Sequence, residues 1–291
     1  MNVVIVYGFL GAGKTSLIRH WLSTGAKPGQ IAVLLNDLGQ VNIDGALLAG
    51  QHLKVLPMAS GCICCTLSGA FTPAVEELHN QWHPDWLVIE PTGIAAPYAL
   101  EDLLRRPRLA RVATLASIVT VVHAARFTEY RAKLAEFYTA QVEQAQIVLL
   151  NHADQASPEQ LSTATQAVRK LNPAARVVVT EYGRLPWAAL AAHVGPAASP
   201  GDEHHHHEPE FESSEISLPP MSEVQLEHLT QALRSGRCGK IFRAKGIVRV
   251  DGVTRLLNFV DGQLDLESVG GEPTLLLVVG QDLRLEGLSR F

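Results

Sequence analysis

The chain has no surplus of positive charge and no uninterrupted apolar run long enough to cross a bilayer. Lys and Arg number 24 against 29 Asp and Glu, which gives a formal net charge of -5 and a pI near 6.2. This balance provides no electrostatic footprint for nucleic acid or for an anionic membrane surface. No charged segment with an apolar stretch precedes the first β-rich run. We expect a cytoplasmic protein that binds small molecules or proteins, and neither nucleic acid nor a membrane.

Cysteine is scarce too, but it is concentrated at one place. Three of the chain's 4 cysteines lie in the run Cys62-Ile63-Cys64-Cys65. In a reducing compartment, clustered cysteines are more often metal ligands or redox groups than structural disulfides. The fourth, Cys238, stands alone before a set of β-rich runs, where a small buried apolar residue is expected.

A glycine-rich loop follows the first apolar run. Gly8 to Thr15 reads G-F-L-G-A-G-K-T, and Val3 to Val6 ahead of it predict a buried strand. Glycines let backbone N–H groups approach phosphate oxygens, and the next helix directs its positive N-terminus at the anion. Lys14 would reach the β- and γ-phosphates, and Thr15 would hold Mg²⁺. The predicted phosphate-binding residues are Gly8, Gly11, Ala12, Gly13, Lys14, Thr15 and Ser16.

Residues 1–194 alternate β-rich runs with helical stretches, which predicts an α/β fold: the parallel sheet of a P-loop NTPase with helices on both faces. The expected strands are residues 3–7, 31–35, 53–56, 86–89, 116–122, 147–150 and 176–180. The expected helices are residues 15–23, 70–82, 124–144 and 158–171, the last with Ser157 as N-cap and Pro158 at its first position.

Residues 195–212 change in composition to Gly, Pro, acidic residues and His204 to His207. Such a segment cannot pack a core and predicts a His-rich mobile linker. The remainder, residues 213–291, predicts a smaller C-terminal α+β domain. It holds one amphipathic helix at residues 222–234 and β-rich runs that include residues 247–250, 256–260 and 275–279.

Four separated motifs together resemble the CobW-type metallochaperone P-loop GTPases, a family that includes the cobalamin-biosynthesis protein CobW and the zinc chaperones. They are Gly8 to Thr15, Asn36 to Asp44, Gly61 to Cys65, and Ile89 to Gly93. The run Phe242 to Gly246 is similar to part of the family's second domain. The resemblance implies GTP and Mg²⁺ as cofactors, slow GTP hydrolysis, and a metal ion carried to a client protein.

The thiolate cluster suits a soft metal ion. Zn²⁺ prefers four tetrahedral ligands, so Cys62, Cys64 and Cys65 form a compact cage that lacks one ligand, and an incomplete shell favours transfer. Zinc is the first expectation and cobalt the second. Water, Asp37, a histidine or a donor from the recipient would complete the shell. Two alternatives stay open: a redox pair of Cys62 and Cys65, and buried apolar packing.

Two acidic positions accompany the phosphate loop. Glu90 follows a predicted strand, where P-loop proteins place an acidic residue near Mg²⁺, and Gly93 would sense the γ-phosphate through its N–H. Asp37 lies in a loop expected to order with the triphosphate. The family usually has Glu at Asp37 and at Gln40, so Gln40 removes a charge. Lys14 and Glu90 are the catalytic candidates, and the sequence names no residue that positions the attacking water.

Base recognition is expected at Asn151-His152-Ala153-Asp154, which stands where the family has N-K-x-D. Asp154 keeps a carboxylate that accepts from the guanine N1 and N2 donors. His152 replaces the lysine that packs along the base and the phosphate loop. His123 follows a β-rich run where the family generally carries aspartate, and the sequence offers no physical account of that change.

The resulting expectation is a GTP-dependent metallochaperone, with His204, His205, His206 and His207 as an auxiliary metal-collecting site. The alternative for those histidines is a solvated polyhistidine loop or a cloning remnant, although their internal position in acidic sequence argues against a tag. Rival functions are a nucleotide-regulated metal buffer or sensor, cobalt handling for cobalamin biosynthesis, and a small-metabolite kinase. A homo-oligomer stays open.

Overall fold

The computed structural model describes residues 1–23, 29–36, 55–58, 71–91, 98–191, 212–260 and 262–285. They fall into two compact units, an N-terminal and a C-terminal one. The predicted linker lies outside these residues except for Glu212, where the first strand of the C-terminal unit begins. Within the described ranges, no helix combines the length and the apolar character that a bilayer crossing requires.

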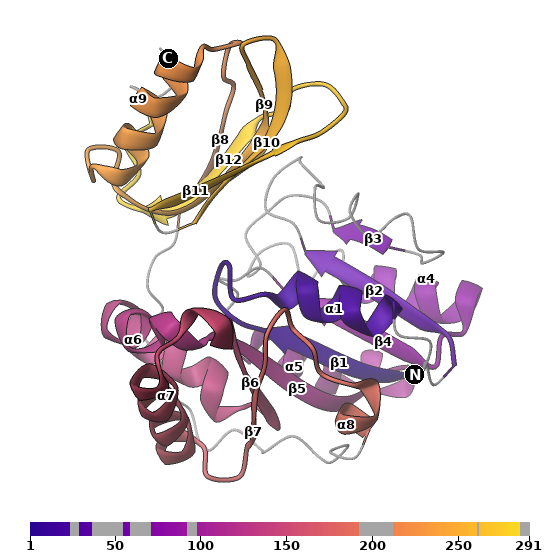
Figure 1. The fold of residues 1–291 in the computed structure, drawn as a ribbon. Helices are drawn as coiled ribbons and strands as arrows, with labels where there is room; N and C mark the ends of the chain where they lie inside the picture. Colours follow the sequence, from indigo (N-terminus) through magenta and orange to yellow (C-terminus); the bar gives the residue numbers. More distant parts are fainter. Residues whose placement is uncertain are drawn as a thin grey trace. The chain divides into compact units, whose positions relative to one another are not determined.

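The N-terminal unit is built on a seven-stranded parallel sheet in the order β3-β2-β4-β1-β5-β6-β7, which confirms the predicted α/β architecture (Figure 1). Its central strands are buried runs rich in Val, Ile and Leu, as expected for a sheet covered on both faces, whereas the edge strand at Arg176–Val179 is partly exposed. They are β1 (Asn2–Tyr7), β2 (Ile31–Asn36), β3 (Val55–Met58), β4 (Trp86–Glu90), β5 (Thr114–His123), β6 (Ile147–Asn151) and β7 (Arg176–Val179).

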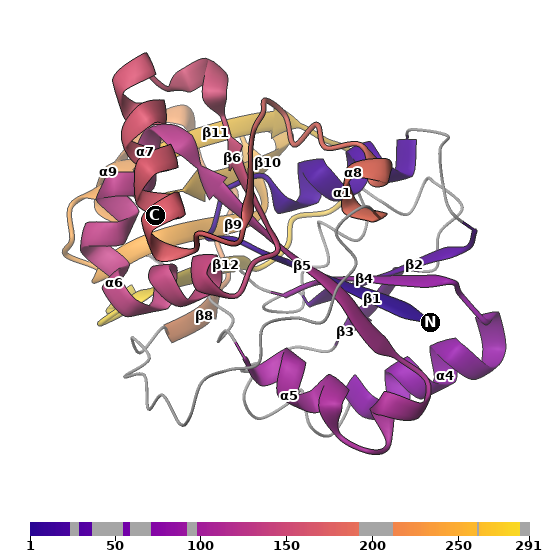
Figure 2. The same cartoon turned by 90° about the horizontal axis from the view of Figure 1, so that it is seen from below.

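Alternate side chains of the central strand β1 pack into two separate hydrophobic cores. Val3, Ile5 and Tyr7 pack with the helices α4 (Thr72–Trp82) and α5 (Ala99–Arg105) on one face. Val4 and Val6 pack with α1 (Lys14–Ser23) and α8 (Trp187–Ala191) on the other. Figure 2 shows these two pairs of helices on opposite sides of the sheet. Helices α6 (Phe127–Glu143) and α7 (Pro158–Leu171) pack against each other and against β5 and β6.

The predicted bounds of α7 agree with the structure to the residue. Ser157 accepts from the Gln160 backbone N–H at 3.1 Å, and the Gln160 side chain accepts from the Ser157 backbone N–H at 2.8 Å, which completes a capping box. Helices α5 and α8 were not predicted. A hydrogen bond of 3.0 Å from the Tyr7 hydroxyl to the buried Glu101 carboxylate ties α5 to β1.

The C-terminal unit is a five-stranded antiparallel sheet with one helix on it, as the predicted α+β class requires. Helix α9 (Glu223–Arg234) starts at a second capping box, formed by Ser222 and Gln225. Its Leu226, Leu229 and Leu233 pack on the sheet, and Cys238 lies in the same core. The strands are β8 (Glu212–Ile216), β9 (Lys240–Val250), β10 (Val253–Val260), β11 (Gln263–Ser268) and β12 (Leu276–Gln281).

Candidate functional site

The parallel sheet places the predicted site residues at one edge. All seven strands run in the same direction, so their carboxyl ends meet there. The glycine loop follows β1, Glu90 ends the neighbouring β4, and Asn151 ends β6. The described residues that were predicted to bind phosphate, Mg²⁺ and the base therefore lie along one edge of one sheet.

The glycine loop adopts a backbone that side chains would obstruct. Gly8, Gly11 and Gly13 have φ values of +145°, +74° and +104°. A Cβ on Gly8 would collide with the Val121 carbonyl, and one on Gly13 would collide with the Asn151 amide nitrogen. The loop therefore needs glycine both for its dihedrals and for close packing against the ends of β5 and β6.

Lys14 begins α1 beneath this loop. Its side chain is only 6% exposed, and Nζ donates to the carbonyls of Gly8 at 2.9 Å and Phe9 at 3.4 Å. An ammonium group held among loop carbonyls at the N-terminus of a helix is placed to meet a phosphate anion. Ala12 is buried in the loop, whereas Gly11 and Ser16 are exposed.

Thr15 and Glu90 lie together. The Thr15 hydroxyl donates to the Glu90 carboxylate, at 3.0 Å from Oε1 and 3.2 Å from Oε2. Glu90 is 8% exposed, so this carboxylate is a buried group of the site and not a solvated strand end. A hydroxyl and a carboxylate are oxygen donors of the kind that Mg²⁺ prefers.

The end of β6 is joined to both the glycine loop and the loop after β7. The Asn151 amide donates from Nδ2 to the Ala12 carbonyl at 2.9 Å, and its Oδ1 accepts from the Gly183 N–H at 2.9 Å. The Ala153 N–H donates to the Thr180 carbonyl at 3.2 Å. Asn151 thus has a structural role in joining the two loops, while Asp154 beside it is exposed.

His152 contacts the glycine loop, as expected of a residue that takes the place of the lysine. Its Nε2 lies 3.1 Å from the Gly11 carbonyl. A carbonyl can only accept, so this contact requires the hydrogen on Nε2. The imidazole stacks on His123 at the end of β5, with ring centroids 4.1 Å apart and an interplanar angle of 11°. His123 and His152, two of the departures from the family pattern, are therefore neighbours in space.

His123 is partly buried within this pair. Burial, followed by the nearby His152 and Arg126, lowers the pKa of His123 to about 4, against the opposing effect of Asp154 and Glu129. His123 is therefore a neutral ring at physiological pH. Its Nδ1 is buried and has no hydrogen-bond partner among the described residues.

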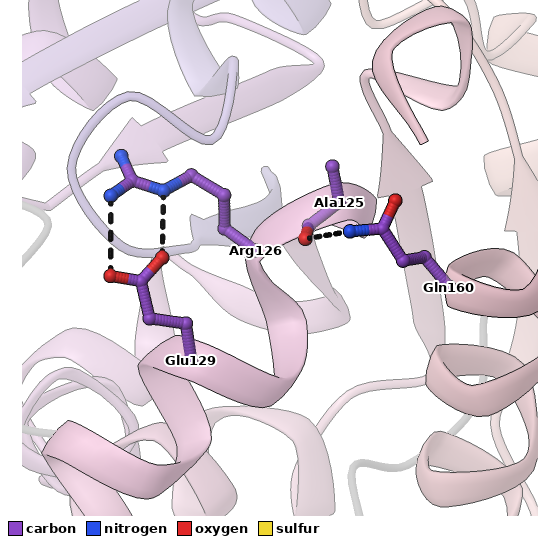
Figure 3. Close-up of polar contacts among 4 residues, drawn as sticks. All are labelled: Ala125, Arg126, Glu129 and Gln160. Carbon is purple, nitrogen blue, oxygen red and sulfur yellow. Dashed lines mark hydrogen bonds and ion pairs between the residues drawn. The ribbon is translucent and has the colours of Figure 1, made fainter. Parts of the chain in front are cut away.

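The turn after His123 is fixed at two points, drawn in Figure 3. Arg126 donates to Glu129, from Nε to Oε2 at 3.2 Å and from Nη2 to Oε1 at 3.5 Å. Gln160 on α7 donates to the Ala125 carbonyl at 3.1 Å. Arg126 also lies over the Tyr130 ring, which meets Phe9 of the glycine loop edge to face. These contacts hold the start of α6 against the loop.

Several predicted residues lie outside the described part of the chain. These are Asp37, Gln40, Cys62, Cys64, Cys65, Gly93 and His204 to His207. Among the residues that the structure describes, no three His, Cys, Asp or Glu side chains gather as a metal site. Cys238 is buried, and burial raises the pKa of its thiol, which confirms the expectation of a small core residue.

Sequence reasoning missed the contribution of the loop after β7. Tyr182 is 64% exposed and has a φ of +55°, and Gly183 has a φ of +67°. A Cβ on Gly183 would lie 2.6 Å from the backbone nitrogen of Leu17 in α1. The signal for this loop in the sequence was the run Glu181-Tyr182-Gly183, which directly follows the predicted strand at residues 176–180.

Comparisons with known proteins agree with this geometry. The chain is 30% identical to the zinc chaperone CobW of Pseudomonas aeruginosa, over 98% of this chain and 82% of that protein. It is 29% identical to the zinc chaperone YeiR of Escherichia coli, over 86% and 76%. The crystal structure of Zn(II)-bound YjiA GTPase from Escherichia coli shares the fold, with a TM-score of 0.51 at 21% identity over 99% and 96%. Because the model of the CobW/HypB/UreG nucleotide-binding domain matches residues 2–179, the chain belongs to that family.

Proposed function

We propose that this P-loop GTPase is a metallochaperone that couples GTP binding and slow hydrolysis to the transfer of zinc to a metal-requiring client protein. The observation that carries the proposal is the contact of Thr15 with Glu90 at 3.0 Å beside Lys14. Thr15 would hold Mg²⁺, Glu90 would bind it through water, and Lys14 would stabilise charge on the transferred phosphoryl group.

The strand order supports coupling between the triphosphate and the thiolates. Asn36 and Met58, the last residues of β2 and β3, are register partners, and Leu35 pairs with Glu90 on β4. The segments that carry Asp37, the three cysteines and Gly93 therefore leave from adjacent strand ends. In this proposal a change at the γ-phosphate is relayed to the thiolates through these segments.

Zinc is the cargo that the ligand types favour. Cys62, Cys64 and Cys65 supply soft thiolates, which suit zinc. Two relatives that are 30% and 29% identical to this chain carry the name zinc chaperone. Cobalt is the second choice. His204 to His207 would collect metal from dilute supply, in a linker at residues 195–212 between a GTPase domain at 1–194 and a second domain at 213–291. A reducing cytoplasm would keep the thiols available.

Guanine is the base that the site favours. Asp154 is exposed after β6, while Asn151 fixes its loop. A carboxylate there accepts from the N1 and N2 donors of guanine, and adenine offers no such pair of donors. GTP is therefore the proposed nucleotide.

The test is the rate of GTP hydrolysis with and without Zn²⁺, for the natural chain and for a variant with Cys62, Cys64 and Cys65 changed to serine. Cys238→Ser is the matched control, because this thiol is buried in the other unit. We expect slow turnover that Zn²⁺ changes in the natural chain and in the control, but not in the triple variant. Rapid metal-free hydrolysis that is the same in all three chains would contradict the coupling.

A further inference from the structure

We propose that Tyr7 and Glu101 are positioning residues for GTP hydrolysis: their hydrogen bond fixes the helix that follows Glu90 to the strand that leads into the glycine loop. The inference rests on the proposed role of Glu90 at Mg²⁺ and adds two residues that act through it. Neither residue belongs to the motif Gly8 to Thr15 or to the run Ile89 to Gly93.

The hydrogen bond joins two parts of the chain that both lead to the phosphate end of the site. Tyr7 is the last residue of β1, and the glycine loop begins at the next residue, Gly8. Glu101 lies in α5, which residues 91–98 connect to Glu90 at the end of β4. The Tyr7 hydroxyl donates to Glu101 Oε2 at 3.0 Å. This contact therefore links the start of the glycine loop to the helix after Glu90.

A carboxyl group is energetically unfavourable in the surroundings of Glu101. Its side chain is 2% exposed, and Leu100, Leu103 and Leu104 of the same helix pack in the hydrophobic core that also contains Tyr7. A buried carboxyl group destabilises the fold unless it is hydrogen-bonded. Its second oxygen, Oε1, has no hydrogen-bond partner in the described part of the chain. Packing alone would be served by an apolar residue, so the feature to explain is the bond to Tyr7.

The direction of this hydrogen bond is determined by the two pKa values. Burial, followed by the nearby Glu101, raises the pKa of Tyr7 well above its ordinary value, so the hydroxyl keeps its proton. Burial also raises the pKa of Glu101, against the lowering effects of its backbone hydrogen bond, Tyr7 and Arg105, while Asp102 adds to the rise. A carboxyl group can accept in either protonation state, so Tyr7 remains the donor in both.

Helix α5 has few local determinants of its own position. It has 7 residues and follows Tyr98, which has a φ of +82° and provides no side-chain cap. Short helices depend on tertiary contacts for most of their stability. Loss of the Glu101 hydrogen bond should therefore let α5 shift, and the connected residues 91–98 with it. Because this stretch includes Gly93, predicted to sense the γ-phosphate, GTP should be affected more than GDP.

The experiment compares kcat for GTP hydrolysis with the Kd of GDP and of a non-hydrolysable GTP analogue. Tyr7→Phe and Glu101→Leu should each lower kcat about tenfold and weaken the GTP analogue, with the Kd of GDP within about twofold of the natural chain. The double variant should be no slower than either single variant, because both changes remove the same bond. Glu101→Gln keeps an acceptor for the Tyr7 hydroxyl, so its kcat should stay within about threefold.

Thr120→Val is the matched control for a loss of stability. Thr120 is the register partner of Tyr7 on β5, and its buried hydroxyl donates to the Gln141 carbonyl. The change therefore removes one buried hydrogen bond from the neighbouring strand but none from α5. We expect a lower Tm with kcat within about twofold of the natural chain, when turnover is counted per molecule that binds GDP.

The outcomes separate this inference from the proposed function when Glu90→Gln is measured alongside. If Glu90→Gln slows turnover but Tyr7→Phe and Glu101→Leu do not, the positioning role is overturned and the role of Glu90 stands. Equal losses of kcat in Tyr7→Phe and Thr120→Val would also overturn it, since stability alone would then explain both. Additive losses in the double variant would contradict a shared bond. Normal turnover of Glu90→Gln would overturn the proposed Mg²⁺ site and this inference with it.

Discussion

The phosphate end and the base end of the nucleotide site follow their sequence patterns to different degrees. At the phosphate end, Lys14, Thr15 and Glu90 are the residue types that the motif requires, and hydrogen bonds place them together. At the base end, a stacked pair of His123 and His152 stands where an aspartate and a lysine are expected. A triphosphate with Mg²⁺ needs a fixed cation and hard oxygen donors. A base needs a planar surface beside it and one carboxylate, and several types of side chain can provide the planar surface.

The largest expected effect is at the phosphate end. Lys14→Ala removes the ammonium group from the loop carbonyls and from the phosphate, so GTP turnover should fall by about 10²–10³-fold. Lys170→Ala, at an exposed position in the last turn of α7, should leave turnover unchanged. Steady-state phosphate release measures both. Turnover of Lys14→Ala within about threefold of the natural chain would refute its role.

The next effect breaks base recognition without touching the phosphates. Asp154→Asn places an NH₂ group against the guanine donors, so GDP affinity should fall about ten- to a hundredfold, as expected for a hydrogen bond to a charged group. XDP carries an acceptor at the same position, so its affinity should rise. Calorimetric titration of both nucleotides decides the question. A variant that still prefers GDP would show that Asp154 does not contact the base.

Glu90→Gln tests whether the charge of Glu90 matters for Mg²⁺ at the phosphate end. Gln keeps the size of the side chain and an acceptor for the Thr15 hydroxyl but removes the charge. We expect about tenfold slower turnover and a correspondingly higher Mg²⁺ requirement, since Mg²⁺ strongly favours carboxylate ligands. Glu159→Gln, in the exposed first turn of α7, is the matched control. An unchanged Mg²⁺ dependence would remove Glu90 from the metal site.

The smallest effect is a pH dependence of stability at the base end. The folded pKa of His123 is about 4, below the ordinary value of 6.5, so its contribution is complete above pH 6.5 and is lost as the pH falls towards 4. The groups around it are His152, Arg126, Asp154 and Glu129. Urea unfolding at pH 7.5 and pH 5 should show a smaller loss of stability for His123→Phe, which keeps a ring. An equal loss in both chains would contradict this.

Local signals made some of the fold predictable. The start of α7 was predicted to the residue because Ser157, Pro158 and Gln160 determine it among themselves. Helix α5 was missed because it has only 7 residues and follows Tyr98, at a φ of +82° with no side-chain cap. Strands β8 and β11 were missed because they are the edge strands of their sheet, with few buried side chains.

At the site, too, contiguous motifs were predictable and contacts between distant residues were not. Gly8 to Thr15 is a contiguous motif whose residues act on one ligand, so its chemistry could be read directly from the chain. The contact of His123 with His152 joins residues 29 positions apart through the pairing of β5 with β6, where His123 is the register partner of Asn151. Tyr182 depends on a third strand end. Such contacts follow from the strand order, which the separate motifs do not specify.

The central claim is that nucleotide state sets metal affinity at Cys62, Cys64 and Cys65. The direct measurement is competitive Zn²⁺ titration of the chain with GDP and with a non-hydrolysable GTP analogue, repeated on the triple serine variant and on Cys238→Ser. The account predicts a thiolate-dependent affinity that differs about tenfold between the two nucleotides, about 1.4 kcal/mol of coupling. Equal affinities in both states would contradict the gating mechanism and favour a metal buffer, and binding that survives in the triple serine variant would refute the thiolate site.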